Sequence, residues 1–400
     1  MTVEELKIER LFGKCCGCGA CAAVCPVGAI EMSYGPDGFT YPAVDHDKCL
    51  SCHRCEGICP SINVRSLDSV TCTYWAHDLL EERLKACSSG GVFGSLARIV
   101  LSKGGAVCGA VFDRDYRAVK HAVIDGEDGL SPMLRSKYVQ SSISPTVYRE
   151  IKDRLSSGQF VLFSGTACQV AAIRGYLGKL ATSSRFVTVD VICHGVPSPG
   201  VWSKWIEYKK EALGGMVRDV SFRCKDNGWR DYSVIIEAVA DDGTKRCYRA
   251  PFTSDWYMKA FLSDASLRSS CCQCPSKRKC GSDITLGDFW GVEDCHPEAL
   301  DDYGVSAVVC NTDKGSELFD LVAGGLSYGA CEYGEILAGN PSLEKSSIPF
   351  NRRDDFFNDV LSDESMDAIC SRWSFKDSLG RRFASKVRRL TGALVKRIKQ

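Results

Sequence analysis

The sequence has no net charge, no long apolar run and no secretory leader. Its 400 residues include 50 basic and 50 acidic side chains. Because binding to a phosphate backbone needs a positive surface, this balance argues against a nucleic-acid partner. No run reaches the roughly 18 consecutive apolar residues of a membrane span. Residues 1–14 contain acidic side chains and lack the apolar core of a signal peptide, so the protein is predicted to be cytoplasmic.

Cysteine, by contrast, is abundant, with 24 residues. A high cysteine content is typical either of a secreted disulfide scaffold or of a reduced protein with metal sites. The absence of a signal peptide favours the second interpretation. The length of the chain and its 44% hydrophobic content predict at least two buried cores and two or three domains.

Two cysteine runs near the N-terminus share one spacing. Residues 15–26 read CCGCGACAAVCP and residues 49–60 read CLSCHRCEGICP. Both fit C-x2-C-x2-C-x3-C-P, in which three cysteines bind one 4Fe-4S cluster and the fourth binds the other. A pair of zinc knuckles would need two separated C-x2-C pairs instead. The predicted ligands are Cys15, Cys18, Cys21 and Cys59 for one cluster, and Cys49, Cys52, Cys55 and Cys25 for the other.

Residues 1–66 are therefore predicted to be a two-cluster ferredoxin domain. Short strands are expected at 29–34 and 40–44, on either side of a Gly-Pro-Asp-Gly turn. Cys16 lies outside the ligand spacing and is interpreted as a small core residue.

From about residue 72 the pattern changes to alternating strands and helices. Apolar residues at helical spacing predict a helix from Val92 to the Gly104-Gly105 pair, followed by strands at 105–112 and 119–124. The Ser88-Ser89-Gly90-Gly91 segment precedes this helix. Backbone N–H groups at a helix start suit a phosphate or pyrophosphate, although an ordinary serine cap explains the same residues.

A second unit reads as a strand at 160–163, a tight turn at 164–166 and a helix at 167–177. This order is typical of a ligand-binding edge of a parallel sheet. Cys168 falls in the first turn of the helix, and Cys193 follows a further strand at 186–192, so both cysteines are expected at the same edge.

Three more cysteines precede a predicted strand at 283–287. Cys271, Cys274 and Cys280 follow a C-x2-C-x5-C spacing. Together with Cys168 and Cys193 they offer five candidates for the four positions of a third cluster, whereas a structural zinc or free core thiols is the alternative.

Seven segments carry a resemblance to a known protein family. They are CCGCGACAAVCP at 15–26, SSGGVFGSLA at 88–97, LRSKYVQSS at 134–142, LFSGTACQVAAI at 162–173, VDVICHGVPSP at 189–199, SFRCKDNGW at 221–229 and SDITLGDFWG at 282–291. The chain resembles the coenzyme F-420 hydrogenase/dehydrogenase beta-subunit family, specifically its bacterial members with an N-terminal two-cluster ferredoxin. The resemblance extends from about residue 10 to residue 360.

The resemblance implies FAD in an α/β body, beside a third 4Fe-4S cluster. The implied flavin contacts are Ser88, Ser89, Gly90, Gly91, Ser136, Lys137, Tyr138, Gly165 and Thr166. Cys168, Cys193, Cys271 and Cys274 become the preferred ligands of the third cluster. Relatives have a basic residue at the position of Cys280, which is therefore interpreted as a spare thiol. Cys87 departs from the small polar residue expected before the SSGG segment.

The resulting fold class is α+β and α/β, in four parts. Residues 1–66 form the ferredoxin domain, 70–157 and 158–330 the two parts of the flavoprotein body, and 331–400 a helical C-terminal region. Apolar residues at helical spacing among Lys and Arg predict a basic amphipathic helix at 375–400, which would contact either an anionic membrane surface or the protein's own body.

The predicted function is electron transfer from a ferredoxin-like donor through the clusters to FAD and a substrate, coenzyme F-420 being one candidate, or the reverse. The alternative is an electron-transfer subunit that serves a partner enzyme and has no substrate of its own. His194, Lys137 and Asp288 are candidate proton donors, although structural roles explain each of them equally. By analogy with the family, surface-polysaccharide assembly enzymes are candidate partners, at the inner face of the membrane.

Overall fold

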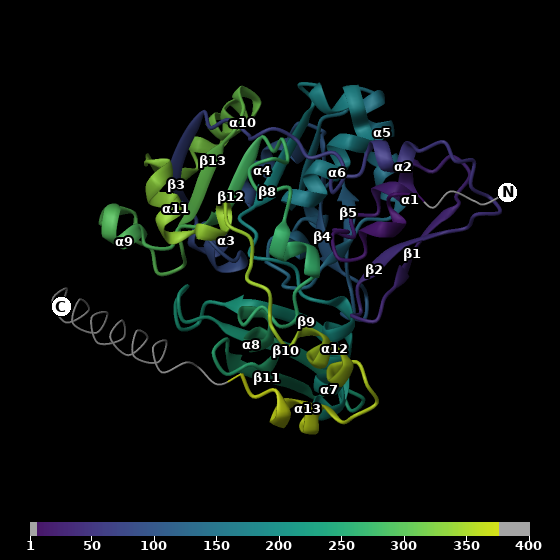
Figure 1. Cartoon of the computed structure of the whole chain (residues 1–400). Coiled ribbons are helices and arrows are strands. Elements are labelled where there is room, and N and C mark those ends of the chain that lie inside the picture. The colour runs from purple at the N-terminus through teal and green to yellow at the C-terminus, as the bar shows by residue number, and fades with distance from the viewer. Residues whose placement is uncertain (1–5, 376–400) are drawn as a thin grey trace, which may run out of the picture.

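A computed structural model gives the fold of residues 6–375, which contains one large sheet and two small ones (Figure 1). The large sheet has nine strands in the order β14-β3-β13-β12-β8-β7-β4-β5-β6. Four neighbouring strands in its centre, β12, β8, β7 and β4, run parallel, and antiparallel pairs flank them. The strands are β3 (Cys72–Asp78), β4 (Ala106–Phe112), β5 (Val119–Ile124), β6 (Ser141–Ser142), β7 (Val161–Thr166), β8 (Phe186–Val191), β12 (Ile284–Asp288), β13 (Ser306–Cys310) and β14 (Leu326–Ala330).

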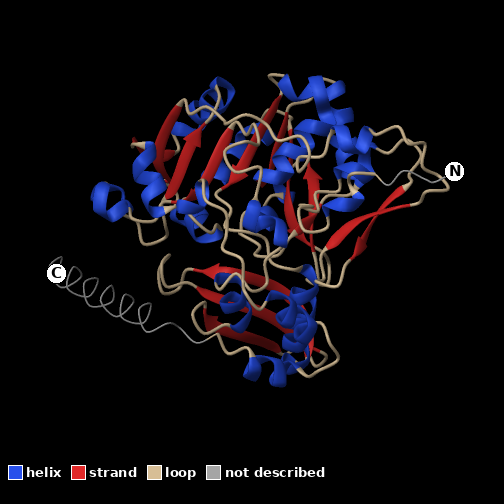
Figure 2. Ribbon diagram, in the orientation of Figure 1, coloured by secondary structure: helices blue, strands red, loops and turns tan. Residues whose placement is uncertain are grey.

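Helices cover both faces of this sheet (Figure 2). Successive strand residues point to opposite faces, so Val161 and Phe163 of β7 pack with one helix layer and Leu162 packs with the other. The first layer contains α5 (Pro145–Ser156) and α6 (Ala167–Leu177), and the second contains α4 (Val92–Ser102) and α10 (Asp313–Ala323). The helix α6 begins with a capping box, in which the side chains of Thr166 and Gln169 bond to each other's backbone N–H groups.

A smaller three-stranded sheet lies beside the large one and has a core of its own (Figure 1). It contains β9 (Gly215–Cys224), β10 (Ser233–Ala240) and β11 (Lys245–Pro251), and its helices are α7 (Pro199–Leu213), α8 (Trp256–Leu262), α12 (Arg353–Val360) and α13 (Met366–Arg372). Ionic contacts connect β9 to the body. Arg135 forms two hydrogen bonds with Asp219, at 2.6 and 2.8 Å, and Arg223 pairs with Asp288.

The N-terminal module contains α1 (Ala20–Val24), β1 (Ile30–Tyr34), β2 (Thr40–Val44) and α2 (Arg54–Gly57). It docks on the body through buried polar groups. The guanidinium of Arg268, which is 1% exposed, donates to the carbonyl oxygens of Cys15 and Thr40 at 2.6 and 2.8 Å. The hydroxyl of Tyr148 donates to the carbonyl oxygen of Cys18 at 2.8 Å.

The remaining helices are α3 (Glu81–Ala86), α9 (Val292–Cys295) and α11 (Tyr333–Gly339). No helix within residues 6–375 is long and apolar enough to cross a membrane. The predicted basic helix at 375–400 lies outside the described residues except for Phe375.

The strands and helices predicted between residues 92 and 192 are present, with bounds that agree to within a few residues. The mixed α/β body is therefore confirmed. The sequence did not indicate the separate sheet β9–β11, nor that strands from 70–157 and 158–330 share one sheet.

The Gly90 backbone lies against β3 and β13 with no room for a side chain. A Cβ on Gly90 would overlap the carbonyl oxygen of Ala76 and approach the Ser306 nitrogen to 2.7 Å. We expect Gly90→Ala to destabilise the protein by about 1–3 kcal/mol, because backbone atoms cannot move aside cheaply. Denaturant unfolding of both proteins measures this difference.

Gly126→Ala is the control, because Gly126 has an extended backbone and a methyl group added there would meet no atom within 4 Å. Equal stability of the Gly90→Ala variant and the wild type would contradict the steric role of Gly90.

Candidate redox centre

The carboxyl ends of the central parallel strands lie at one edge of the large sheet. Thr166 ends β7, Cys193 follows β8, and Asp288 ends β12. Parallel strands bring their carboxyl ends to the same edge, which is where ligands bind in open α/β sheets. The three side chains come from segments far apart in sequence but face this common edge.

Four cysteines converge beside this edge. Burial raises the pKa of Cys193 to about 12, and the nearby Cys168 and Cys274 thiols raise it further. Burial also raises the pKa of Cys271, and Cys193, Cys168 and Cys274 add to this shift. The four thiols repel one another as anions, so a positively charged iron centre would stabilise their thiolates. Their chemistry fits a 4Fe-4S cluster.

Cys16 lies between this group and the N-terminal module. It is buried, as predicted, and its thiol hydrogen-bonds to both Cys168 and Cys18. The hydrogen bond with Cys16 raises the pKa of Cys168, and burial raises it further. One side chain thus contacts a predicted ligand of the first cluster and one of the third.

The eight predicted ligands of the N-terminal module form two neighbouring groups. Burial raises the pKa of Cys21 to about 12, and the adjacent Cys15 and Cys59 raise it further. Cys18 also senses Cys21 and Cys59, which matches the predicted set with the crossing fourth cysteine. In the second group, Cys25 and Cys49 pack with Cys55 around one apolar cluster, and Cys55 senses Cys52.

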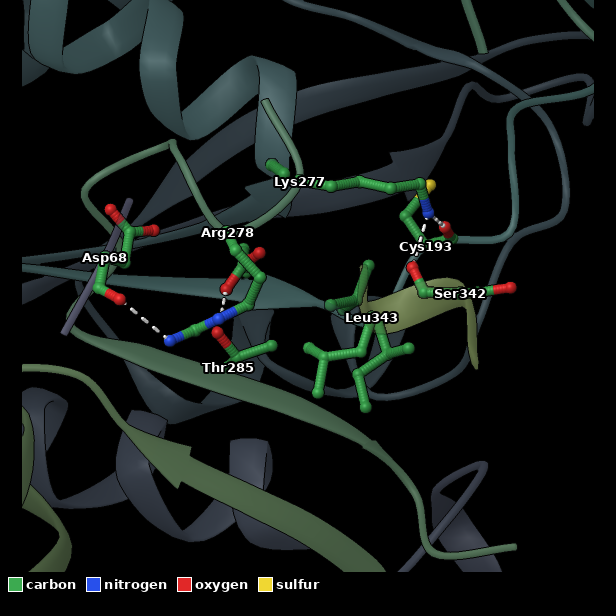
Figure 3. Close-up of a pocket in the computed structure, with 11 residues that line it drawn as sticks. Asp68, Cys193, Lys277, Arg278, Thr285, Ser342 and Leu343 are labelled. Carbon is green, nitrogen blue, oxygen red and sulfur yellow. Dashed lines mark hydrogen bonds between the residues drawn. The ribbon is translucent and has the colours of Figure 1, made fainter. Parts of the chain in front are cut away.

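A small cavity lies on the other side of Cys193 (Figure 3). Its volume is about 10 Å³, which is room for one water molecule and far too little for a flavin. Lys277 closes it by donating to the carbonyl oxygens of Cys193 and Ser342, and Arg278 donates to the carbonyl oxygen of Asp68 at 3.1 Å. These bonds fix the chain on either side of the cavity.

Cys280 lies near the same cavity but bonds elsewhere. Its thiol donates to Asp68 at 3.6 Å and to Asp190 at 3.7 Å. Burial raises the pKa of Asp190 to about 6. Contacts with two carboxylates favour a protonated thiol, which supports leaving Cys280 out of the ligand set.

The predicted flavin contacts divide into two connected groups. In the first, the backbone N–H of Ser136 donates to the hydroxyl of Ser88 at 2.8 Å, and Gly91, with φ of 82°, begins α4. Ser89 and Gly90 instead bond to Val305 and Ser306 of the sheet. Ser88 and Gly91 therefore remain the better placed of these residues to meet a ligand.

The second group surrounds Lys137. Burial lowers the pKa of Lys137 to about 7, the nearby Arg135 lowers it further, and its ammonium donates to the Arg135 carbonyl oxygen at 2.7 Å. His121, on β5, senses Lys137 and bonds to the carbonyl oxygen of Ser164 at 2.9 Å. The turn that follows leads to Thr166, whose hydroxyl lies 3.2 Å from the Cys168 sulfur. This group joins the predicted flavin contacts to the cysteines.

Arg223 connects Tyr138 to Asp288 in an aromatic surrounding. Its Nη1 donates to the Tyr138 hydroxyl at 3.3 Å and to Asp288, and its guanidinium carbon lies 4.5 Å from the Tyr232 ring centroid. Trp229 stacks on Trp290 at 4.9 Å beside it. Aromatic faces and cationic donors suit a planar, electron-poor ring.

Two buried donors of Arg223, Nε and Nη2, have no hydrogen-bond partner among the described residues, and the same holds for Nδ1 of His121. Buried polar groups normally find a partner, so these orphaned atoms await a ligand. Together with the Ser88 and Lys137 groups they fit the phosphates and polar ring edge of FAD. The sequence did not single out Arg223 or His121, although Arg223 lies in the SFRCKDNGW segment.

The three candidate proton donors have structural partners. His194 Nε2 lies 2.6 Å from an oxygen of Asp264, and Asp288 accepts from Arg223 and, at 3.3 Å, from Trp229 Nε1. Lys137 donates to a carbonyl oxygen. Their contacts account for all three without catalysis, and their catalytic roles stay predictions.

Comparison with known proteins agrees with these features. Residues 158–329 match the family described as the C terminus of the coenzyme F-420 hydrogenase/dehydrogenase beta subunit, and residues 14–63 match the 4Fe-4S dicluster domain. The chain belongs to this beta-subunit family. It carries two 4Fe-4S clusters in its N-terminal domain and is an iron–sulfur electron-transfer protein of an oxidoreductase family.

Individual relatives match shorter stretches. An archaeal-type glutamate synthase [NADPH] of Thermotoga maritima is 34% identical over 92 residues, which is 22% of this chain and 18% of the synthase. A ferredoxin of Methanocaldococcus jannaschii is 42% identical over 57 residues, which is 14% of this chain and 70% of the ferredoxin. This family member thus spans less than a fifth of the synthase.

A chain from the structure of the F-420-reducing [NiFe] hydrogenase complex of Methanosarcina barkeri has a TM-score of 0.44 and 17% identity. The match covers 78% of this chain and 94% of that one.

The buried His121 predicts a dependence of stability on pH. Burial lowers its pKa to about 4, from an ordinary value near 6.5. The unfolded chain therefore binds the proton more tightly, and stability falls as the pH drops below about 6.5. We expect this group to contribute about 2 kcal/mol of loss between pH 7 and 5. Denaturant unfolding of wild type and His121→Gln at both pH values measures it.

His77→Gln serves as the control, because His77 is a partly exposed histidine of β3. The loss on acidification should shrink in His121→Gln and stay unchanged in His77→Gln. An unchanged loss in both variants would contradict the burial of a neutral imidazole at 121.

Proposed function

We propose that this protein is an iron–sulfur flavoprotein oxidoreductase, which passes electrons between a ferredoxin-like donor, three 4Fe-4S clusters, FAD and a substrate. The observation that carries the proposal is the contact of Cys16 with both Cys18 and Cys168. It connects the N-terminal module to the third group of cysteines. Thr166 then connects Cys168 to the segments that resemble flavin contacts.

The third cluster would be held by Cys168, Cys193, Cys271 and Cys274, and the N-terminal clusters by the two sets of four assigned from the spacing. A bound flavin converts single-electron supply into two-electron chemistry. The chain's own residues would bind it. Ser88 and the start of α4 face its phosphates, and Arg223 supplies donors that otherwise lack partners.

Lys137 is the strongest of the three candidates for proton delivery. Its lowered pKa allows it to gain or lose a proton near neutral pH. Asp288 is paired with Arg223, which holds the acid in its charged form at the same edge. Its role would be to position Arg223 rather than to donate a proton.

The second candidate function is an electron-transfer subunit for a partner enzyme. The cavity beside Cys193 is too small for a substrate, which favours this alternative. Reduction of a partner's cofactor without turnover of any small molecule would support it. The partner would be a redox protein, and enzymes of surface-polysaccharide assembly and contact with the inner face of the membrane remain proposals based on family analogy.

Cofactor content tests the proposal directly. Protein purified without oxygen should contain about twelve irons and one flavin per chain. Cys271→Ser should lower iron to about eight, whereas Cys280→Ser should leave it near twelve. Iron and acid-labile sulfide assays, together with flavin fluorescence after acid release, give these ratios.

A wild-type content of eight irons without flavin would remove FAD and the third cluster from the proposal. The remaining function would be that of a two-cluster electron carrier. Loss of iron in Cys280→Ser as well as in Cys271→Ser would contradict the assignment of ligands.

The proposed path predicts a specific effect at Cys16. Cys16→Ala removes the thiol that joins the two ligand groups but leaves all twelve ligands in place. We expect at least a tenfold slower reduction of flavin after the N-terminal clusters are reduced, with iron and flavin content unchanged. Rapid-mixing spectroscopy measures the rate, and electron paramagnetic resonance measures the magnetic coupling between clusters, which should weaken.

Cys108→Ala is the matched control, because Cys108 is also a fully buried thiol of the same core cluster. Equal flavin reduction rates in Cys16→Ala and wild type would show that electrons follow another route.

A further inference from the structure

A separate group of metal-ligand side chains lies at the β14 end of the large sheet, away from the N-terminal module (Figure 1). Cys295, His296 and Glu335 each offer one ligand atom, and these three atoms lie within 4.8 Å of one another. All three residues are partly buried. Cys295 ends α9 and Glu335 lies in the first turn of α11, so the group joins two helices.

The imidazole of His296 is held in one orientation. Its Nε2 lies 3.1 Å from an oxygen of Glu335, and its Nδ1 lies 3.2 Å from an oxygen of Glu298. Metal-binding histidines usually donate their second ring N–H to a carboxylate in this way, which fixes the tautomer and directs the other nitrogen at the ion. Glu298 would have that outer role and Glu335 the inner one.

The thiol of Cys295 has only weak partners. It lies 3.6 Å from the carbonyl oxygen of Gly291 and 3.8 Å from that of Val292. Cys331 packs against the same apolar cluster and lies close enough to Cys295 and Glu335 for their charges to affect its thiol. Two cysteines, a histidine and a carboxylate therefore surround one point.

We propose that Cys295, His296 and Glu335 bind a zinc ion, with Cys331 as the fourth ligand. Zinc accepts sulfur, nitrogen and oxygen ligands in a tetrahedron, at about 2.3 Å from sulfur and 2.0–2.2 Å from nitrogen and oxygen. Ligand atoms around such an ion lie roughly 3.3–3.8 Å apart, so the present separations need only a small contraction. Four protein ligands leave no open position, which makes the site structural.

The ion would stabilise one wall of the candidate flavin site. The chain between β12 and α9 carries Trp290, which stacks on Trp229 and faces Arg223. The end of α11 packs on Trp290 so closely that a side chain at Gly339 would overlap the Trp290 backbone. A bond from α9 to α11 through zinc fixes both helices around this tryptophan.

The test uses the full chain with all iron–sulfur clusters in place. After equilibration with zinc and removal of the excess, elemental analysis should find about one zinc per chain. X-ray absorption at the zinc edge, which iron does not disturb, should show both sulfur at about 2.3 Å and lighter atoms near 2.0 Å. Hydrogen exchange should show faster opening of residues 288–300 after zinc is chelated.

Cys295→Ser is the decisive variant, because it removes one ligand but keeps the contacts of His296 with Glu298 and Glu335. We expect its zinc affinity to fall at least tenfold, with unchanged iron content. Cys247→Ser is the control, because Cys247 is an exposed thiol on β11. Less than a tenth of a zinc per wild-type chain, a ligand shell without sulfur, or equal zinc binding by Cys295→Ser would overturn the proposal.

Discussion

The buried guanidinium of Arg268 is the contact on which the arrangement of the redox centres depends. Its three hydrogen bonds all go to neutral acceptors, namely the carbonyl oxygens of Cys15 and Thr40 and the amide of Gln140. A buried charge needs compensation, and an iron–sulfur cluster with four thiolates carries negative charge. Arg268 also begins the segment that leads to Cys271, so one residue links the N-terminal module to the third group of cysteines.

Around this contact, the sheet edge gathers groups with complementary tasks. Parallel strands deliver Thr166, Cys193 and Asp288 to one line, and the small sheet adds Arg223 from the opposite side. Electron-transfer ligands and cofactor contacts are thus positioned by the same backbone geometry. A shift of β7 or β8 would move both together, which explains why their hydrogen-bonded ladder runs through the most buried part of the core.

The local features of this arrangement were predictable, and the contacts across long sequence distances were not. The cysteine spacing fixes the N-terminal module, and hydrophobic periodicity finds β7, α6 and β8 because each is a local pattern. The contact of Cys16 with Cys168 depends on docking between modules, which no local pattern encodes. His121 and Arg223 escaped notice for the same reason, since each acquires its meaning only from neighbours on other strands.

The link between Arg268 and Cys15 spans 253 residues of sequence. During synthesis the ferredoxin module therefore leaves the ribosome long before the residue that anchors it. At 5–20 residues per second, the delay is roughly 13–50 seconds. For that time Cys16 and Cys18 are uncovered by the body, which leaves the N-terminal thiols open to iron and sulfide. Assembly of the first clusters can thus precede the closure that buries them.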